Sequence, residues 1–136
     1  PEQRGQAFIA LGDYTAARQQ YEQSALDGEK ELIELITDDW IWRLPHVINR
    51  AHLWLLANDA RGQDELEALL RGFEQMTRQE IVNPVASYWA ACAHALLGRS
   101  QQARDMLAEA RRIGWHHPWW ERQDWNIRAL TEFPGS

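Results

Sequence analysis

The side chains best suited to hold a metal ion or move a proton are five histidines: His46, His52, His94, His116 and His117. No two of them stand four residues apart, the spacing that places two imidazoles on one helix face against a metal. His116 and His117 are adjacent, and neighbours on a helix point about 100° apart. We interpret this pair as turn residues before Pro118, and the sequence predicts no metal site.

The other reactive side chains form no catalytic pattern. Cys92 is the only cysteine, which excludes a disulfide within the chain and a cysteine-based zinc cluster. It stands in an apolar helical stretch, where a thiol behaves as a small hydrophobic group. Asp38 and Asp39 are neighbouring carboxylates, but nothing places them in a pocket that would separate their pKa values. Because a glycine-rich phosphate loop and a Gly-x-Ser-x-Gly elbow are also absent, we predict no catalytic residue, no cofactor and no enzyme activity.

Acidic residues gather in one part of the chain. The stretch from Glu22 to Asp39 holds seven acidic residues and one basic residue, Lys30, and so accounts for the net charge of −6. We interpret it as a solvated helix face. A chain with a pI of about 5.3 lacks the positive surface that a phosphate backbone requires, so we predict no nucleic-acid binding.

Membrane and targeting signals are weak or absent. No apolar run approaches the ~18 residues that a membrane-spanning helix needs, so we predict no membrane insertion. The chain starts at Pro1 without a methionine and enters a helical pattern directly, and we expect it to be a piece of a longer protein. The compartment is undecided, with the cytoplasm favoured.

The elements that would position these residues are helices. The prolines stand only at positions 1, 45, 84, 118 and 134, and the segments between them are rich in strong helix formers. From Pro84 to Leu96 the apolar residues recur at spacings of three and four, the stripe of an amphipathic helix. We predict an all-α fold and, at 136 residues, a single domain.

Glycines divide this pattern into helix pairs. The expected breaks within pairs are Gly12, Gly62 and Gly98, with Ser100 as an N-cap and Gly114 ending the last helix. The repeat units are then about 1–27, 46–77 and 84–115, with an irregular insert at 28–45 and a capping tail at 116–136. Gly62 and Gly98 are 36 residues apart, whereas Gly12 and Gly62 are 50 apart, which locates the extra residues in the insert. Stacking such pairs covers the apolar face that each would expose alone.

These residues resemble the tetratricopeptide repeat (TPR). The first unit carries Gly5, Phe8, Gly12, Tyr14, Ala17 and Tyr21, and the last carries Ala91, Gly98, Ala103, Leu107 and Ala110. The middle unit keeps Gly62 but has Glu67 or, with a one-residue shift, Ala68 at a small-residue position. The resemblance implies antiparallel helix pairs stacked as a short α-solenoid. The tail looks like the ends of repeat domains in bacterial regulators and cyclases, and we expect Trp119, Trp120 and Leu130 to cover the last repeat.

The resemblance also implies a concave groove lined by the first helix of each pair. Its register places Gln6 and Ile9, then Asn49, His52, Leu56 and Asp59, then Tyr88, Cys92 and Ala95 toward a ligand. From these we take six as partner-binding candidates: Asn49, His52, Leu56, Asp59, Tyr88 and Cys92. No basic residue stands among them to clamp a peptide carboxylate, so we expect an amphipathic helix or an extended apolar segment as the occupant.

Three functions remain open at this point. The first is a non-catalytic scaffold that binds a protein or peptide partner in an apolar concave groove. The second is an effector-sensing or relay domain of a bacterial signalling or transcription regulator, in which a small molecule shifts packed helices. The third is a homo-oligomer formed through the exposed face of a terminal repeat.

Overall fold

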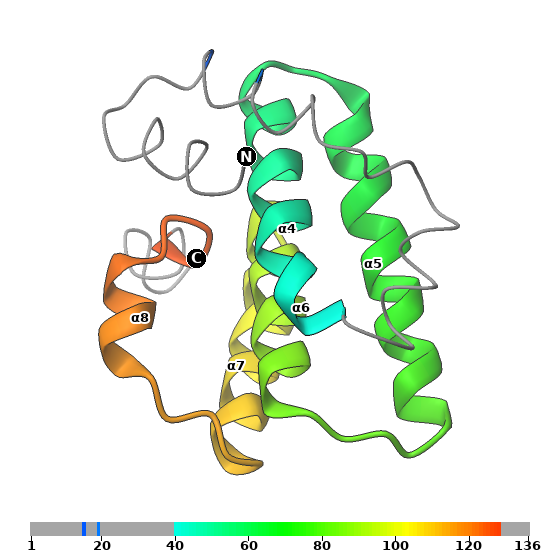
Figure 1. The fold of residues 1–136 in the computed structure, drawn as a ribbon, viewed down its shortest axis with the longest axis vertical. Helices are drawn as coiled ribbons and strands as arrows, with labels where there is room; N and C mark the ends of the chain where they lie inside the picture. Colours follow the sequence, from blue (N-terminus) through cyan, green and yellow to red (C-terminus); the bar gives the residue numbers. More distant parts are fainter. Residues whose placement is uncertain (1–14, 16–18, 20–39, 129–136) are drawn as a thin grey trace. The chain divides into compact units, whose positions relative to one another are not determined.

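The computed structural model describes residues 40–128 together with Thr15 and Gln19. The regular elements of this part are α4 (Trp40–Leu56), α5 (Ala60–Arg78), α6 (Pro84–Leu96), α7 (Ser100–Arg112) and α8 (Pro118–Gln123), shown in Figure 1. The prediction of an all-α fold is confirmed for these residues, which contain no strand. None of their helices is long and apolar enough to cross a membrane. The first repeat unit, most of the insert and Leu130 lie outside the described residues.

The chain divides into two compact units, residues 1–65 and 66–136, and the boundary falls within α5. In the first unit, α4 begins at Trp40 and continues through Pro45. The last six residues of the expected insert, 40–45, therefore belong to this helix. Leu44, Val47 and Ile48 are all buried, and their packing maintains the helix despite the hydrogen bond that Pro45 cannot donate.

The turn from α4 to α5 is made by Asn58. This residue has φ 56°, its amide donates to the Leu55 carbonyl at 3.0 Å, and the amide of Asp59 donates to the Trp54 carbonyl at 2.8 Å. These two bonds satisfy the last carbonyls of α4, and asparagine tolerates the left-handed conformation better than most residues. The Asp59 carboxylate then accepts the Arg61 amide at 3.0 Å and caps α5.

Gly62 does not break the chain, contrary to our prediction. It lies in the first turn of α5, where a Cβ would stand 2.7 Å from the Ala51 carbonyl oxygen. The absence of a side chain lets the two helices approach closely at this crossing. Further along, Arg50 pairs with Glu65 at 2.6 Å, and the order of these contacts makes the helices antiparallel.

The second unit contains the pair α6 and α7, which pack against each other (Figure 1). Asn83 caps α6 by accepting the amides of the second and third helical residues at 2.9 and 3.2 Å. Gly98 ends the helix with φ 77°, and the Arg99 amide donates to the His94 carbonyl at 2.9 Å. This is the same kind of turn as at Asn58. Ser100 is not the N-cap that we predicted, because it is already helical and the cap position is Arg99.

The C-terminal segment turns at Gly114 and enters α8 at Pro118, the position predicted for a first helical residue. His116 and His117 lie in this connection, as predicted. Trp119 and Trp120 do not cover the last helix pair in the way that we expected. Trp119 and Trp120 are 50% and 36% exposed, and α8 buries none of its residues. The buried members of the segment are Trp115, Asp124, Asn126 and Ile127.

Candidate functional site

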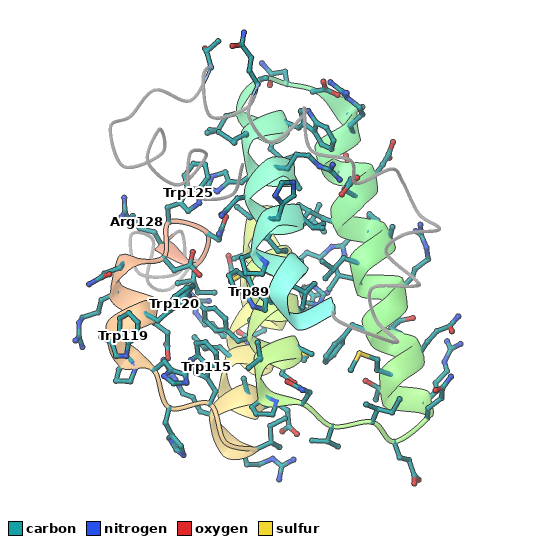
Figure 2. All side chains as sticks on the ribbon, viewed as in Figure 1. Trp89, Trp115, Trp119, Trp120, Trp125 and Arg128 are labelled. Carbon is teal, nitrogen blue, oxygen red and sulfur yellow. The ribbon has the colours of Figure 1, made fainter. Side chains whose placement is uncertain are left out.

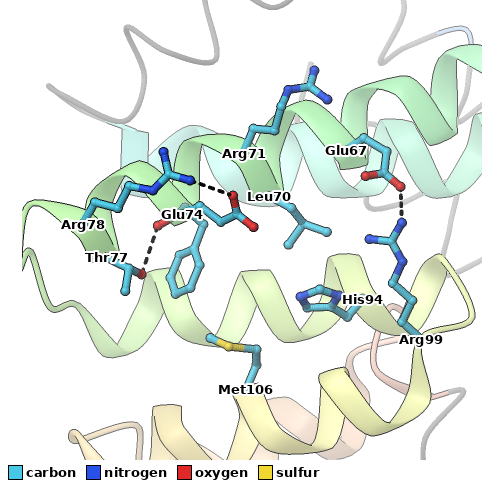
Figure 3. A pocket seen from close by; sticks show the side chains of 10 residues that line it. Glu67, Leu70, Arg71, Glu74, Thr77, Arg78, His94, Arg99 and Met106 are labelled. Atoms are coloured by element: carbon cyan, nitrogen blue, oxygen red, sulfur yellow. Dashed lines mark hydrogen bonds and ion pairs between the residues drawn. The ribbon is translucent and has the colours of Figure 1, made fainter.

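A groove of about 460 Å³ lies among the second half of α5, α6 and α7, all within the second unit (Figure 3). Its lining combines apolar, basic and acidic side chains: Glu67, Leu70, Arg71, Phe73, Glu74, Thr77, Arg78, His94, Arg99 and Met106. Leu70, Phe73 and Met106 supply the apolar part, with the ring of His94 between α5 and α7. Charged residues form the rim.

One edge of the groove is a charged stripe on α5. Glu67, Arg71, Glu74 and Arg78 follow one another at intervals of four, three and four residues, which keeps all of them on one helix face. Their charges alternate in sign. Within the helix, Arg78 lies 3.8 Å from Glu74, and both side chains are largely exposed. The stripe therefore offers paired charges of both signs to a molecule in the groove.

A second ion pair crosses the groove. Arg99, which precedes α7, donates to the carboxylate of Glu67 on α5. Both side chains are about one-third exposed, so solvent screens this pair and its contribution to stability is small. Its effect is positional, because it holds a charge of each sign at the end of the groove nearest His94 (Figure 3).

His94 lies on α6 beside this pair. Its Nδ1 atom is buried and has no hydrogen-bond partner among the described residues. Burial lowers the pKa of His94 below its ordinary value, the charge of Arg99 lowers it further, and Glu67 and Glu74 oppose the shift. The ring is thus neutral at pH 7 and, depending on its tautomer, Nδ1 can donate or accept one hydrogen bond.

No family model, curated protein or solved structure matches the chain. Among the described residues, no group of three or more His, Cys, Asp or Glu side chains is arranged to hold a metal ion.

Four of the six predicted partner-binding residues belong to the first unit. Asn49 is 3% exposed, and His52 is half-buried on the same helix. Leu56 is 54% exposed at the end of α4. Asp59 uses both carboxylate oxygens to accept hydrogen bonds from Arg61. Of the four, Leu56 presents the clearest surface to a partner.

The other two, Tyr88 and Cys92, meet in the interior of the second unit. The Tyr88 hydroxyl donates to the Asp124 carboxylate at 2.5 Å, and the Cys92 sulfur lies 3.8 Å from the same oxygen. The second oxygen of Asp124 accepts the amide and the side chain of Asn126, each at 3.0 Å. Tyr88 and Cys92 are fully buried, so neither lines an open groove as we expected. The chain's own C-terminal segment covers them.

This burial also decides the chemistry of the two groups. Desolvation raises the pKa of Tyr88 far above its ordinary value, and the nearby Cys92 and Asp124 raise it further. Desolvation likewise raises the pKa of the Cys92 thiol, with the Asp124 charge as the next cause. Both groups stay protonated at neutral pH, and the thiol is therefore a poor nucleophile.

Aromatic contacts hold the C-terminal segment in place. Trp115 stacks on Tyr88 with ring centroids 4.1 Å apart, and Trp120 meets Trp89 edge-on at 6.4 Å. Figure 2 shows these tryptophans gathered between α6 and α8. Glu121 accepts the Trp115 indole N–H at 3.0 Å. The ring of Trp115 thus covers Tyr88, and the hydrogen bond to Asp124 fixes its hydroxyl group.

We expected the contact surface on the first helix of each pair, whereas most of the lining of the groove comes from α5, the second helix of its pair. The alternating charges from Glu67 to Arg78 are the signal that could have found it. The partners of that stripe, His94 and Arg99, come from other segments and only the tertiary structure brings them to it.

Proposed function

We propose that this chain is a TPR-like helical-repeat module that holds a segment of a partner protein in the groove beside His94. The two described helix pairs support the repeat architecture. Each is closed by a residue in the left-handed conformation, Asn58 or Gly98, and these positions are 40 residues apart. This spacing is longer than the TPR period of about 34 residues, and α5 accounts for the surplus because it has 19 residues against 13 in α7.

The groove is the observation that carries the proposal. It is open, its apolar side chains come from α5 and α7, and ion pairs line its rim. An amphipathic helix or an extended segment with one apolar anchor matches this arrangement, since the anchor covers Leu70, Phe73 and Met106 while flanking charges meet the rim. Binding of this kind needs no catalytic step.

A second candidate function is favoured by His94. The volume of about 460 Å³ falls in the range of small-molecule sites, roughly 300–1,000 Å³, and His94 lines the groove with an Nδ1 atom that has no hydrogen-bond partner in the part of the chain that the structure describes. A small effector that filled the groove beside His94 would fit a sensing domain of a larger regulator.

Site-specific photo-crosslinking tests the proposal. A photoreactive residue replaces Thr77, which lines the groove and is exposed, and in a matched control it replaces Gln102, which is exposed on α7 but does not line the groove. We expect a discrete protein adduct at position 77 and none at position 102. Equal labelling at both positions, or none at either, would contradict a binding role for the groove.

The effector alternative has its own readout. Any ligand that binds only the folded chain raises its apparent stability by an amount that grows with ligand concentration. We expect a His94→Gln variant to lose such a shift if a metabolite causes it. A metabolite panel that leaves the melting temperature of the wild-type chain unchanged would leave the protein-binding proposal alone in place.

A further inference from the structure

The charged stripe of α5 is complementary to itself when reversed. In two antiparallel copies of the helix related by a two-fold axis between residues 72 and 73, Glu67 lies opposite Arg78 and Arg71 lies opposite Glu74. All four contacts across the axis then join opposite charges. In a parallel arrangement in register, each charge would face its own copy, and every contact would be repulsive.

We propose that a second copy of this chain is a partner of the groove, docked with its α5 antiparallel to the first. The inference rests on the proposed use of the groove for protein binding and names the occupant. It goes beyond the expected self-association through a terminal repeat face, because it uses the middle of the chain.

The groove supplies apolar contact area, which the charged stripe lacks. Exposed ion pairs contribute little to affinity, so the stripe decides orientation and register and not the strength of binding. Apolar contact comes from Phe73, which stands at the level of the axis along α5 but about 100° around the helix from Glu74, and which lines the groove together with Leu70 and Met106. The stripe spans 12 residues from Glu67 to Arg78, about 16 Å along the helix axis, which is short for a permanent interface. The dimer is accordingly weak and sensitive to salt.

The ion pair between Glu74 and Arg78 within one chain does not prevent this docking. The Glu74 and Arg78 side chains are 70% and 76% exposed and lie 3.8 Å apart, so each keeps hydrogen-bonding positions for a second partner. A carboxylate has about four acceptor positions and a guanidinium has five donors. The same groups can therefore serve both the chain and its copy.

Sedimentation equilibrium over a range of protein concentrations and salt tests the proposal with two charge reversals. Arg71→Glu places a new carboxylate opposite the Glu74 carboxylate at two contacts across the axis, and Glu74→Arg places two guanidinium groups opposite each other at the same contacts. We expect each variant to dimerise at least about tenfold more weakly than the wild type. An equimolar mixture of the two variants restores association, because both contacts then join opposite charges.

The mixture separates docking from effects within one chain. A helix weakened by its own charge reversal stays weakened when another variant is added, so recovery on mixing supports docking between chains. The matched control is Arg112→Glu, which breaks an ion pair with Glu109 three residues away on α7, outside the groove. We expect it to leave the dimer constant unchanged. Circular dichroism confirms that each variant is folded.

Two results would overturn the inference. One is a wild-type mass that stays monomeric at all concentrations in low salt. The other is a mixture that associates no better than either variant. If either result appears while position 77 still crosslinks to a different protein, the second copy is not the occupant and the proposed function stands. If position 77 crosslinks to nothing, the proposed function fails as well.

Discussion

Replacing Tyr88 with phenylalanine tests whether the C-terminal segment is held by one buried hydrogen bond. Tyr88 is fully buried, and its hydroxyl donates to the Asp124 carboxylate at 2.5 Å. Asp124 is 9% exposed, and when the hydroxyl is removed it keeps the two donors of Asn126 and the weakly donating Cys92 thiol at 3.8 Å. The ring and its stack on Trp115 are unchanged, so the substitution removes the hydrogen bond with little change in packing.

The expected cost follows from the chemistry of the pair. A hydrogen bond to a charged group contributes about 1.5–3 kcal/mol, and a donor–acceptor distance of 2.5 Å lies at the short, strong end for a hydroxyl and a carboxylate. Because Asn126 still satisfies one carboxylate oxygen, we expect about 2 kcal/mol of lost unfolding free energy. Combining Tyr88→Phe with Asp124→Asn should give a smaller loss than the sum of the single changes.

Urea denaturation followed by tryptophan fluorescence measures these losses, since Trp115 lies against Tyr88. Thr77→Val serves as the control. It removes an exposed hydroxyl that donates to the Phe73 carbonyl at 3.2 Å, and the expected change is under about 0.5 kcal/mol. If Tyr88→Phe costs no more than this control, or if the two substitutions at the pair are fully additive, the hydrogen bond does not hold the segment and the reasoning is refuted.

Three further changes test the helix crossing at Gly62, the burial of Cys92 and the surroundings of His94. Gly62→Ala should destabilise the chain by about 1–3 kcal/mol in thermal or urea unfolding, because the new Cβ would meet the Ala51 carbonyl oxygen at 2.7 Å. Alanine has the higher helix propensity, so a stabilised variant would mean that α4 and α5 do not cross closely at this position. The Cys92 thiol, buried and with a raised pKa, should react with a thiol reagent at pH 8 only as fast as the chain opens, and labelling at the rate of a free thiol would contradict its burial. The pKa of His94 is lower in the folded chain than in the unfolded one, so the stability that neutral His94 contributes is present above the ordinary value of 6.5 and is lost as the pH falls through the folded pKa. The unfolding free energy of a His94→Gln variant should therefore fall less between pH 7 and 5 than that of the wild type.

Local features of the described helices could be predicted from sequence. The start of α6 at Pro84, its end at Gly98 and the start of α8 at Pro118 depend on what each backbone position can adopt, and those limits act within a few residues. The same reasoning failed at Gly62, since a glycine can also serve a close helix crossing. The turn between α4 and α5 was predicted at Gly62, but it is made by Asn58. Asparagine adopts the left-handed conformation less often than glycine and therefore gives a weaker sequence signal for a turn.

The contacts that hold the C-terminal segment could not be predicted in this way. Asp124 carries no sequence pattern that links it to Tyr88, 36 residues earlier, and the hydrogen bond exists only because the segment after α8 returns to α6. Trp119 and Trp120 illustrate the same limit. Their large apolar side chains suggested that they cover the last helix pair. Both are exposed because of the direction in which α8 presents them, and Trp115 and its neighbours are buried instead.

By itself the sequence determined the helical class, several helix ends and the spacing of the charges along α5, because these follow from backbone preferences and the helical period over short distances. The tertiary structure alone decided that Tyr88 and Cys92 are interior and that His94 and Arg99 meet the α5 stripe at a groove. Burial and pairing of this kind depend on which faces pack together, and a periodic pattern shows that a face is apolar without showing what covers it.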